Sequence, residues 1–181
     1  RLVAPKPYTR DEIRGKKIAI PGEMTSAYLA LKLFEPDIET VSVPFDEIMD
    51  FVKAGNADMG LIIHEGQLTY ADEGMHLVLD TGEWWAEEPG GLPMTLGGNV
   101  IRRDLGEDVI RRTSELLRAS IAYGLENRKA GLEYAKDYGR GLNDEQTDEF
   151  VGMYVNERTL DYDEDARRSV QLFLDRGYEA G

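Results

Sequence analysis

The chain has 181 residues, of which 41% are hydrophobic, enough to bury a core. Its formal net charge of −14 argues against nucleic-acid binding, because contact with phosphates needs a basic face that this sequence lacks. It has no cysteine, which excludes disulfides and thiolate nucleophiles, and no run approaches the ~18 apolar residues that span a bilayer. We therefore expect a soluble protein without nucleic-acid or membrane partners. The absence of cysteine leaves the redox compartment open, and cytoplasmic localisation is a separate expectation.

The first predicted unit is a strand followed by a helix whose amino terminus can hold an anion. Residues 18–20 form a short apolar strand that Pro21 and Gly22 close. Thr25 and Ser26 then precede a run of helix formers at 28–34. The free N–H groups and the dipole of such a helix favour a carboxylate or a phosphate. Helix capping also explains the two hydroxyls, and the two roles are compatible.

Two more strands and a helix complete a β-α-β-α-β order. Residues 39–43 are the second predicted strand, and 44–54 are a helix with Phe45 among the apolar residues at helical spacing. Residues 58–63 are the third strand. This order favours parallel pairing with right-handed crossovers. The turn at Thr25 and the residues after the third strand should then share one edge of the sheet.

His64 stands at the carboxyl end of the third predicted strand and is followed by Glu65. Ligands bind at this edge in open α/β sheets, and an imidazole with an unperturbed pKa of ~6.5 can act as a general base near neutral pH. A solvated or hydrogen-bonded structural histidine is the alternative interpretation. The second histidine, His76, falls at an outward position of a predicted strand at 75–80.

The rest of the chain turns helical after an irregular crossing. Adjacent Trp84 and Trp85 are expected in different environments, one in the core and the other exposed or lining a pocket. Residues 94–101 form a predicted strand that a glycine pair breaks, and helices begin near residues 104, 128, 143 and 163, the second ending at Gly139 and Gly141. We predict an α/β lobe at 1–93 and, at 94–181, a crossover strand and helices of another lobe. These helices either form a small bundle or cover a sheet outside this chain.

Several blocks carry a resemblance to a known enzyme family: residues 22–27, 60–70, 82–85, 92–99, 118–123, 138–141 and 153–156. The chain resembles 1,4-dihydroxy-6-naphthoate synthase of the futalosine route to menaquinone. The likeness is specific because Ile-Ile-His-Glu at 62–65 and Gly-Glu-Trp-Trp at 82–85 occur together and in order. A sister family, chorismate dehydratase, is less similar at these blocks.

The resemblance implies an α/β fold like that of periplasmic binding proteins, with two lobes and the ligand between them. It implies a lyase that needs no cofactor or metal and converts cyclic dehypoxanthine futalosine, a small aromatic carboxylate, to 1,4-dihydroxy-6-naphthoate. His64 matches the family's proton acceptor, and Thr25 and Ser26 match its substrate-contacting pair. The chain opens with Arg1 and lacks the family's amino-terminal segment, so we expect that segment or a second chain to complete the first lobe.

Two other functions compete with the lyase. The same fold serves widely in binding proteins, so the chain is alternatively a non-catalytic binder of a small aromatic carboxylate. A metal hydrolase using His64, Glu65 and Asp80 is disfavoured, because the histidine and glutamate lack the helical HExxH spacing.

Overall fold

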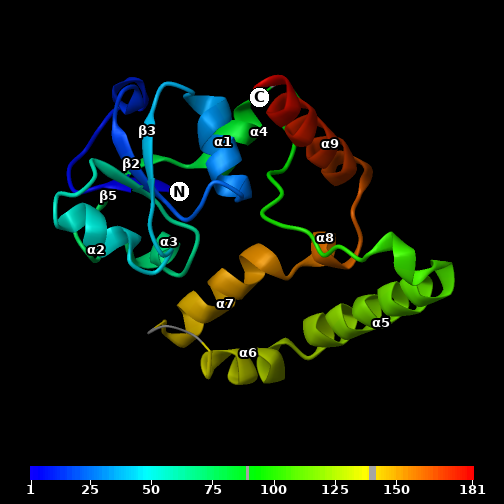
Figure 1. Ribbon diagram of the computed structural model, residues 1–181. Coiled ribbons are helices and arrows are strands. Elements are labelled where there is room, and N and C mark those ends of the chain that lie inside the picture. The colour runs from blue at the N-terminus through cyan, green and yellow to red at the C-terminus, as the bar shows by residue number, and fades with distance from the viewer. Residues whose placement is uncertain (89, 139–141) are drawn as a thin grey trace. The chain divides into compact units, whose positions relative to one another are not determined.

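The computed structural model describes residues 1–88, 90–138 and 142–181 of the chain (Figure 1). The predicted helix end at Gly139 and Gly141, and most of the sequence block at 138–141, lie outside the described residues. A five-stranded sheet in the order β3-β2-β4-β1-β5 forms the centre of the amino-terminal part. Its strands are β1 (Leu2–Ala4), β2 (Lys17–Ile20), β3 (Glu39–Ser42), β4 (Met59–Leu61) and β5 (His76–Leu79).

The predicted parallel pairing is confirmed. Strand β2 pairs in parallel with β3 on one side and with β4 on the other, where Ile18 lies opposite Met59 and Ala19 opposite Gly60. Strand β1 was not predicted, and it runs antiparallel between β4 and β5. All of its residues are buried, so an apolar triplet that the sequence places in a lead segment is an interior strand of the sheet, next to the edge strand β5.

A helix follows each of the five strands. In the amino-terminal part they are the 3-10 helix η1 (Arg10–Ile13), α1 (Ser26–Phe34), α2 (Ile48–Lys53), α3 (Gly66–Thr69) and α4 (Thr81–Glu87). The 3-10 helix η2 (Arg103–Leu105), α5 (Glu107–Glu126), α6 (Arg128–Lys136), α7 (Asp144–Tyr154), α8 (Glu157–Leu160) and α9 (Glu164–Glu179) come later. The structure therefore confirms a helical second half.

The chain divides into two compact units that differ from the predicted lobes. The first unit contains Arg1–Leu96 together with Arg168–Gly181, and the second contains Gly97–Arg167. The predicted division at residue 93 differs from this one by residues 94–96 and by most of α9. Chain proximity placed α9 with its sequence neighbours, whereas its apolar residue Phe173 packs into the core of the first unit.

The predicted strand at 94–101 is wrong, because none of these residues, all of which are described, has regular secondary structure. The beginning of this segment and the residue before it are held by hydrogen bonds from side chains instead of by a neighbouring strand. Pro93 O accepts a hydrogen bond from Ser169 Oγ at 2.6 Å, and Leu96 O accepts one from Ser26 Oγ at 2.8 Å. Backbone carbonyls bonded in this way do not need a strand partner.

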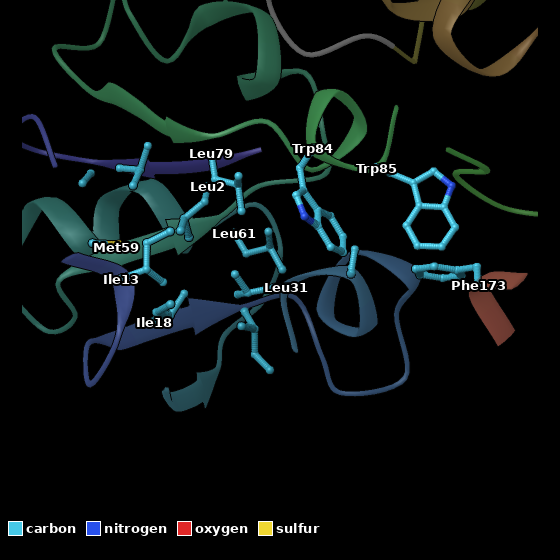
Figure 2. Packing of buried hydrophobic residues seen from close by; sticks show 14 residues of the cluster. Leu2, Ile13, Ile18, Leu31, Met59, Leu61, Leu79, Trp84, Trp85 and Phe173 are labelled. Atoms are coloured by element: carbon cyan, nitrogen blue, oxygen red, sulfur yellow. The ribbon is translucent and has the colours of Figure 1, made fainter. Parts of the chain in front are cut away.

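Two apolar clusters pack on the sheet of the first unit. Alternate strand residues point to opposite faces, so Leu2 and Ile18 belong to one cluster whereas Val3 and Ala19 belong to the other. Helices α1, α4 and α9 contribute to the first cluster, which Figure 2 shows, and α2 contributes to the second.

Both tryptophans are buried in the first cluster, so the prediction of different environments is wrong. Trp84 is 9% exposed and Trp85 is 1% exposed. The rings form a row of edge contacts, with Phe34 5.6 Å from Trp84, Trp84 5.8 Å from Trp85, and Trp85 5.3 Å from Phe173 between centroids (Figure 2). Helix α4 is covered on one side by α1 and on another by α9, and for this reason two adjacent positions are buried.

A buried serine fixes α9 to α4 and to the segment after it. Ser169 is 1% exposed, and its Oγ accepts a hydrogen bond from Trp85 Nε1 at 2.8 Å while donating to Pro93 O. Arg176 adds an ion pair with Glu88 at 2.7 Å and lies 5.3 Å from the centre of the Trp85 ring. The carboxyl-terminal helix is thus bonded to the first unit by polar as well as apolar contacts.

In the second unit, the apolar face predicted for α5 is exposed. No residue of α5, every position of which is described, is buried. Leu116 is 72% exposed, and Val109 and Leu117 are each more than 40% exposed. These helices therefore do not enclose a bundle core around α5.

We expect Ser169→Ala to lower the free energy of unfolding of the first unit by about 1–3 kcal/mol, because it leaves the buried Trp85 N–H without its acceptor. Both tryptophans lie in this unit, so urea unfolding followed by tryptophan fluorescence measures the loss. Ser42→Ala is the matched control, since Ser42 is exposed on β3, and a change within about 0.5 kcal/mol is expected there. Equal effects of the two substitutions would contradict the role given to Ser169.

Candidate site at the carboxyl edge of the parallel strands

The candidate site is built from the turns that follow three parallel strands. Because β3, β2 and β4 lie side by side and run in the same direction, their carboxyl ends meet at one edge of the sheet. The turn after β2 carries Thr25 and Ser26, the turn after β3 carries Phe45, and the turn after β4 carries His64. The structure therefore brings the predicted site residues to the same edge, as the strand order predicts.

Thr25 is the N-cap residue of α1. Its Oγ1 accepts a hydrogen bond from the backbone N–H of Tyr28 at 3.2 Å and donates one to Gly22 O at 2.9 Å. Capping of this kind satisfies one of the N–H groups that the helix itself cannot pair. The hydroxyl of Thr25 is thus committed to the fold of the turn.

The hydroxyl of Ser26 is committed as well, since it donates to Leu96 O. Within α1 the N–H groups of Ser26 and Ala27 have no helical acceptor, because they belong to the first turn. They are the donors that this helix end offers to an anion, and the helix dipole favours negative charge there. The capacity for an anion thus resides in backbone groups and not in the two hydroxyls.

The His64 imidazole is packed into the turn after β4. Its side chain is 12% exposed, and its Nε2 atom is shielded from solvent. Nδ1 accepts a hydrogen bond from the backbone N–H of Gly66 at 2.9 Å. The predicted position at the strand end is thus confirmed, whereas the ring itself faces protein atoms over most of its surface.

Phe45 is a neighbour of His64 that sequence analysis assigned to a different role. The predicted helix at 44–54 begins only at Ile48, so Phe45 lies in the turn before α2, where it is 40% exposed. Its ring centroid is 6.0 Å from that of His64. The parallel strand order could have predicted this neighbour, because it places the turn after β3 at the same edge of the sheet as His64.

Glu65 and Asp80, the other members of the metal-site alternative, do not converge with His64 on one point. Glu65 Oε2 is 3.9 Å from His64 Nδ1, beyond hydrogen-bond distance. Asp80 caps α4 by accepting from the N–H groups of Gly82 and Glu83, and it pairs with Arg1 at 2.9 Å. Burial opposes the charged form of Asp80, but the hydrogen bonds from Glu83 and Arg1 outweigh it and lower its pKa.

The described residues contain no group of three or more His, Cys, Asp or Glu side chains arranged to hold a metal ion. None of the helices in the described ranges is long and apolar enough to cross a membrane.

Comparison with known proteins gives consistent results. A family model described as menaquinone biosynthesis matches residues 1–179. The chain is 40% identical over 164 residues to a 1,4-dihydroxy-6-naphthoate synthase of Thermus thermophilus, covering 90% of this chain and 60% of the relative. It is 35% identical over 176 residues to the protein of the same name from Streptomyces coelicolor, covering 94% of this chain and 62% of the relative. The chain thus spans about three fifths of the length of these relatives.

Solved structures show the same fold. A crystal structure of an Archaeoglobus fulgidus protein matches with a TM-score of 0.88 and 43% identity, covering 99% of this chain and 65% of that one. A periplasmic sulfonate-binding protein of Methylobacillus flagellatus matches with a TM-score of 0.64 and 14% identity, covering 99% of this chain and 58% of that one. The predicted α/β fold of the periplasmic-binding-protein kind is therefore confirmed.

We expect Thr25→Ala to lower the free energy of unfolding of the first unit by ~1 kcal/mol, because α1 loses its N-cap acceptor. Thr25→Ser keeps a hydroxyl at the same position and should retain most of the stability. Urea unfolding monitored by tryptophan fluorescence is informative here, since α1 ends at Phe34 against Trp84. A loss as large in the serine variant as in the alanine variant would contradict the capping role.

Proposed function

The chain belongs to the menaquinone-biosynthesis family, and on this premise we propose that it carries the catalytic residues of a 1,4-dihydroxy-6-naphthoate synthase. The observation that carries the proposal is the shared sheet edge, where the turn of His64 and the amino terminus of α1 leave neighbouring parallel strands. A basic nitrogen and a set of anion-binding N–H groups are the two elements that the reaction needs. The chain spans about three fifths of the length of these relatives. The synthase activity is therefore proposed for the whole protein to which these residues belong.

In the proposed reaction, His64 removes a proton from the cyclic portion of cyclic dehypoxanthine futalosine. The substrate bond to hydrogen breaks, and an N–H bond forms on the imidazole. The released electron pair forms a new double bond of the ring while the carbon–carbon bond to the sugar-derived fragment breaks. The fragment leaves with the electron pair of that bond and takes up a proton. Formation of the aromatic naphthoate ring drives this elimination. No electrons are gained or lost overall, so the step requires no redox cofactor. A positioned histidine of this kind contributes ~100-fold to 10,000-fold to the rate.

The substrate carboxylate is assigned to the amino terminus of α1. The N–H groups of Ser26 and Ala27 and the helix dipole support this assignment. The side chains of Thr25 and Ser26 act indirectly, because Thr25 shapes the turn and Ser26 holds the carbonyl of Leu96. The substrate-contacting role is therefore proposed for the backbone at this pair.

Catalysis by His64 requires that its ring become accessible to the substrate, since the side chain is only 12% exposed. Phe45 is the partly exposed side chain beside the imidazole. A flat substrate that replaces or stacks on the Phe45 ring would reach the histidine. Aromatic rings pair favourably in this way, which suits a substrate that becomes a naphthoate.

We also propose that further polypeptide, from a longer form of the protein or from a second chain, takes part in the complete enzyme. Helix α5 exposes apolar residues, among them Val109, Leu116 and Leu117. Their exposure supports the proposal that the further polypeptide packs against this helix.

A binding protein that closes on an aromatic carboxylate without chemistry is the second candidate. The observation that favours it is the packing of His64, which presents little of its surface to solvent. Incubating the complete protein with cyclic dehypoxanthine futalosine, followed by mass analysis, separates the two functions. Release of 1,4-dihydroxy-6-naphthoate supports the synthase, and substrate that stays bound and intact supports the binder. Neither binding nor conversion would contradict both.

We expect His64→Asn to lower kcat by ~100-fold or more while substrate binding is retained, because only the proton transfer is lost. Steady-state kinetics and calorimetric binding measure the two quantities separately. His76→Asn is the control, since His76 is exposed on β5 and should leave turnover unchanged. Near-wild-type turnover of the His64 variant would end the general-base proposal.

A further inference from the structure

The hydrogen bond from Gly66 to His64 determines which imidazole nitrogen carries the proton. A neutral imidazole has one nitrogen that donates and one that accepts. The backbone N–H of Gly66 can only donate, and it lies 2.9 Å from Nδ1. Nδ1 is therefore the acceptor, and the proton of the neutral ring lies on Nε2.

Glu65 competes for the same nitrogen but selects the opposite tautomer. A carboxylate accepts hydrogen bonds, so pairing with Glu65 would require the proton on Nδ1. Glu65 Oε2 is 3.9 Å from Nδ1, a distance at which no hydrogen bond forms. Gly66 N lies 2.9 Å from Nδ1, within hydrogen-bond distance. The geometry thus favours the tautomer that Gly66 selects.

The absence of a side chain at Gly66 leaves the space that the His64 ring occupies. A Cβ at this position would lie 2.7 Å from His64 Cε1 and 2.9 Å from Met49 Cε, closer than real Cβ contacts allow. The backbone of Gly66 has an ordinary negative φ, so close approach is the reason for glycine here and not an unusual conformation. Any larger residue must displace the ring or the backbone that bonds to it.

We propose that Gly66 is the positioning residue of His64, holding the neutral imidazole in the Nε2-protonated tautomer so that Nδ1 is the atom that takes up a proton. The catalytic meaning of this assignment rests on the proposed function. Nδ1 has a single lone pair, so the Gly66 N–H must first release it. The substrate bond to hydrogen then breaks, Nδ1–H forms, and the electron pair of the broken bond stays with the substrate. The Glu65 carboxylate, 3.9 Å from Nδ1, then faces the newly charged ring.

Nitrogen NMR of the histidine-labelled protein tests the tautomer directly. The chain has two histidines, and exposed His76 serves as the internal reference. The spectra are recorded at about pH 8.5, well above the usual histidine pKa of ~6.5. We expect the ratio of the Nε2–H form to the Nδ1–H form to be roughly fivefold to tenfold higher at His64 than at His76, the factor that one hydrogen bond of ordinary net strength gives. Averaging like that of His76, or a proton on Nδ1, would overturn the proposal.

Gly66→Ala should move the His64 nitrogen signals toward those of His76 or toward the opposite tautomer. Gly60→Ala is the matched control, because its new Cβ meets Ile48 Cγ2 at 2.6 Å and Val52 Cγ2 at 3.1 Å and none of the nearest atoms belongs to His64. That control should lose stability and keep the tautomer. If Gly66→Ala leaves the His64 signals unchanged, or if Gly60→Ala shifts them equally, Gly66 is not the positioning residue.

These spectra are recorded without substrate, so their outcome is independent of turnover. Full activity of His64→Asn together with the expected spectra would remove the proposed general base but leave the Gly66 assignment intact. The converse result, loss of activity in His64→Asn with an averaged His64 tautomer, would remove the Gly66 assignment and leave the general base. The two proposals therefore fail separately.

Discussion

The parallel pairing of β2 with β3 and β4 is the constraint on which the candidate site depends. Strand direction alone brings the turns after these strands to one edge, although more than 35 residues separate Thr25 from His64 in sequence. Close packing of α2 against this sheet relies on Gly60, where an added Cβ would lie 2.6 Å from Ile48 Cγ2. The helix between β3 and β4 can therefore sit near enough to the sheet to place its preceding turn, with Phe45, beside the histidine.

Within this frame the fold uses most of the polar groups that look functional in the sequence. Thr25 and Asp80 cap helices, and Ser26 bonds to a backbone carbonyl. Short polar side chains at helix starts satisfy N–H groups that would otherwise lack partners, so such a role is expected wherever a helix follows a strand. What these residues leave available for a ligand is backbone N–H, which the succession of strand, glycine turn and helix predicts, whereas the two hydroxyls do not.

Sequence reasoning was sufficient wherever the signal was local and periodic. It predicted the three parallel strands, α1 and the position of His64, because apolar runs, glycine turns and strand order determine these features. It failed for β1, whose three residues become a strand only by pairing with β4 and β5. It failed also for 94–101, where distant serines bond to Leu96 O and to Pro93 O just before the segment. The burial of both Trp84 and Trp85 likewise depends on α9, which arrives from far along the chain. The tautomer of His64 depends on a single backbone distance and has no signature in the sequence.

The return of the chain to its first unit has a topological consequence. The second unit is an insertion, since the chain leaves at Leu96 and comes back at Arg168. Every member of the two apolar clusters lies outside the inserted residues, as does each residue of the candidate site. Joining residue 96 to residue 168 would thus excise a module without removing any side chain from either core, whereas a simple cut after residue 96 would also discard Ser169 and Phe173.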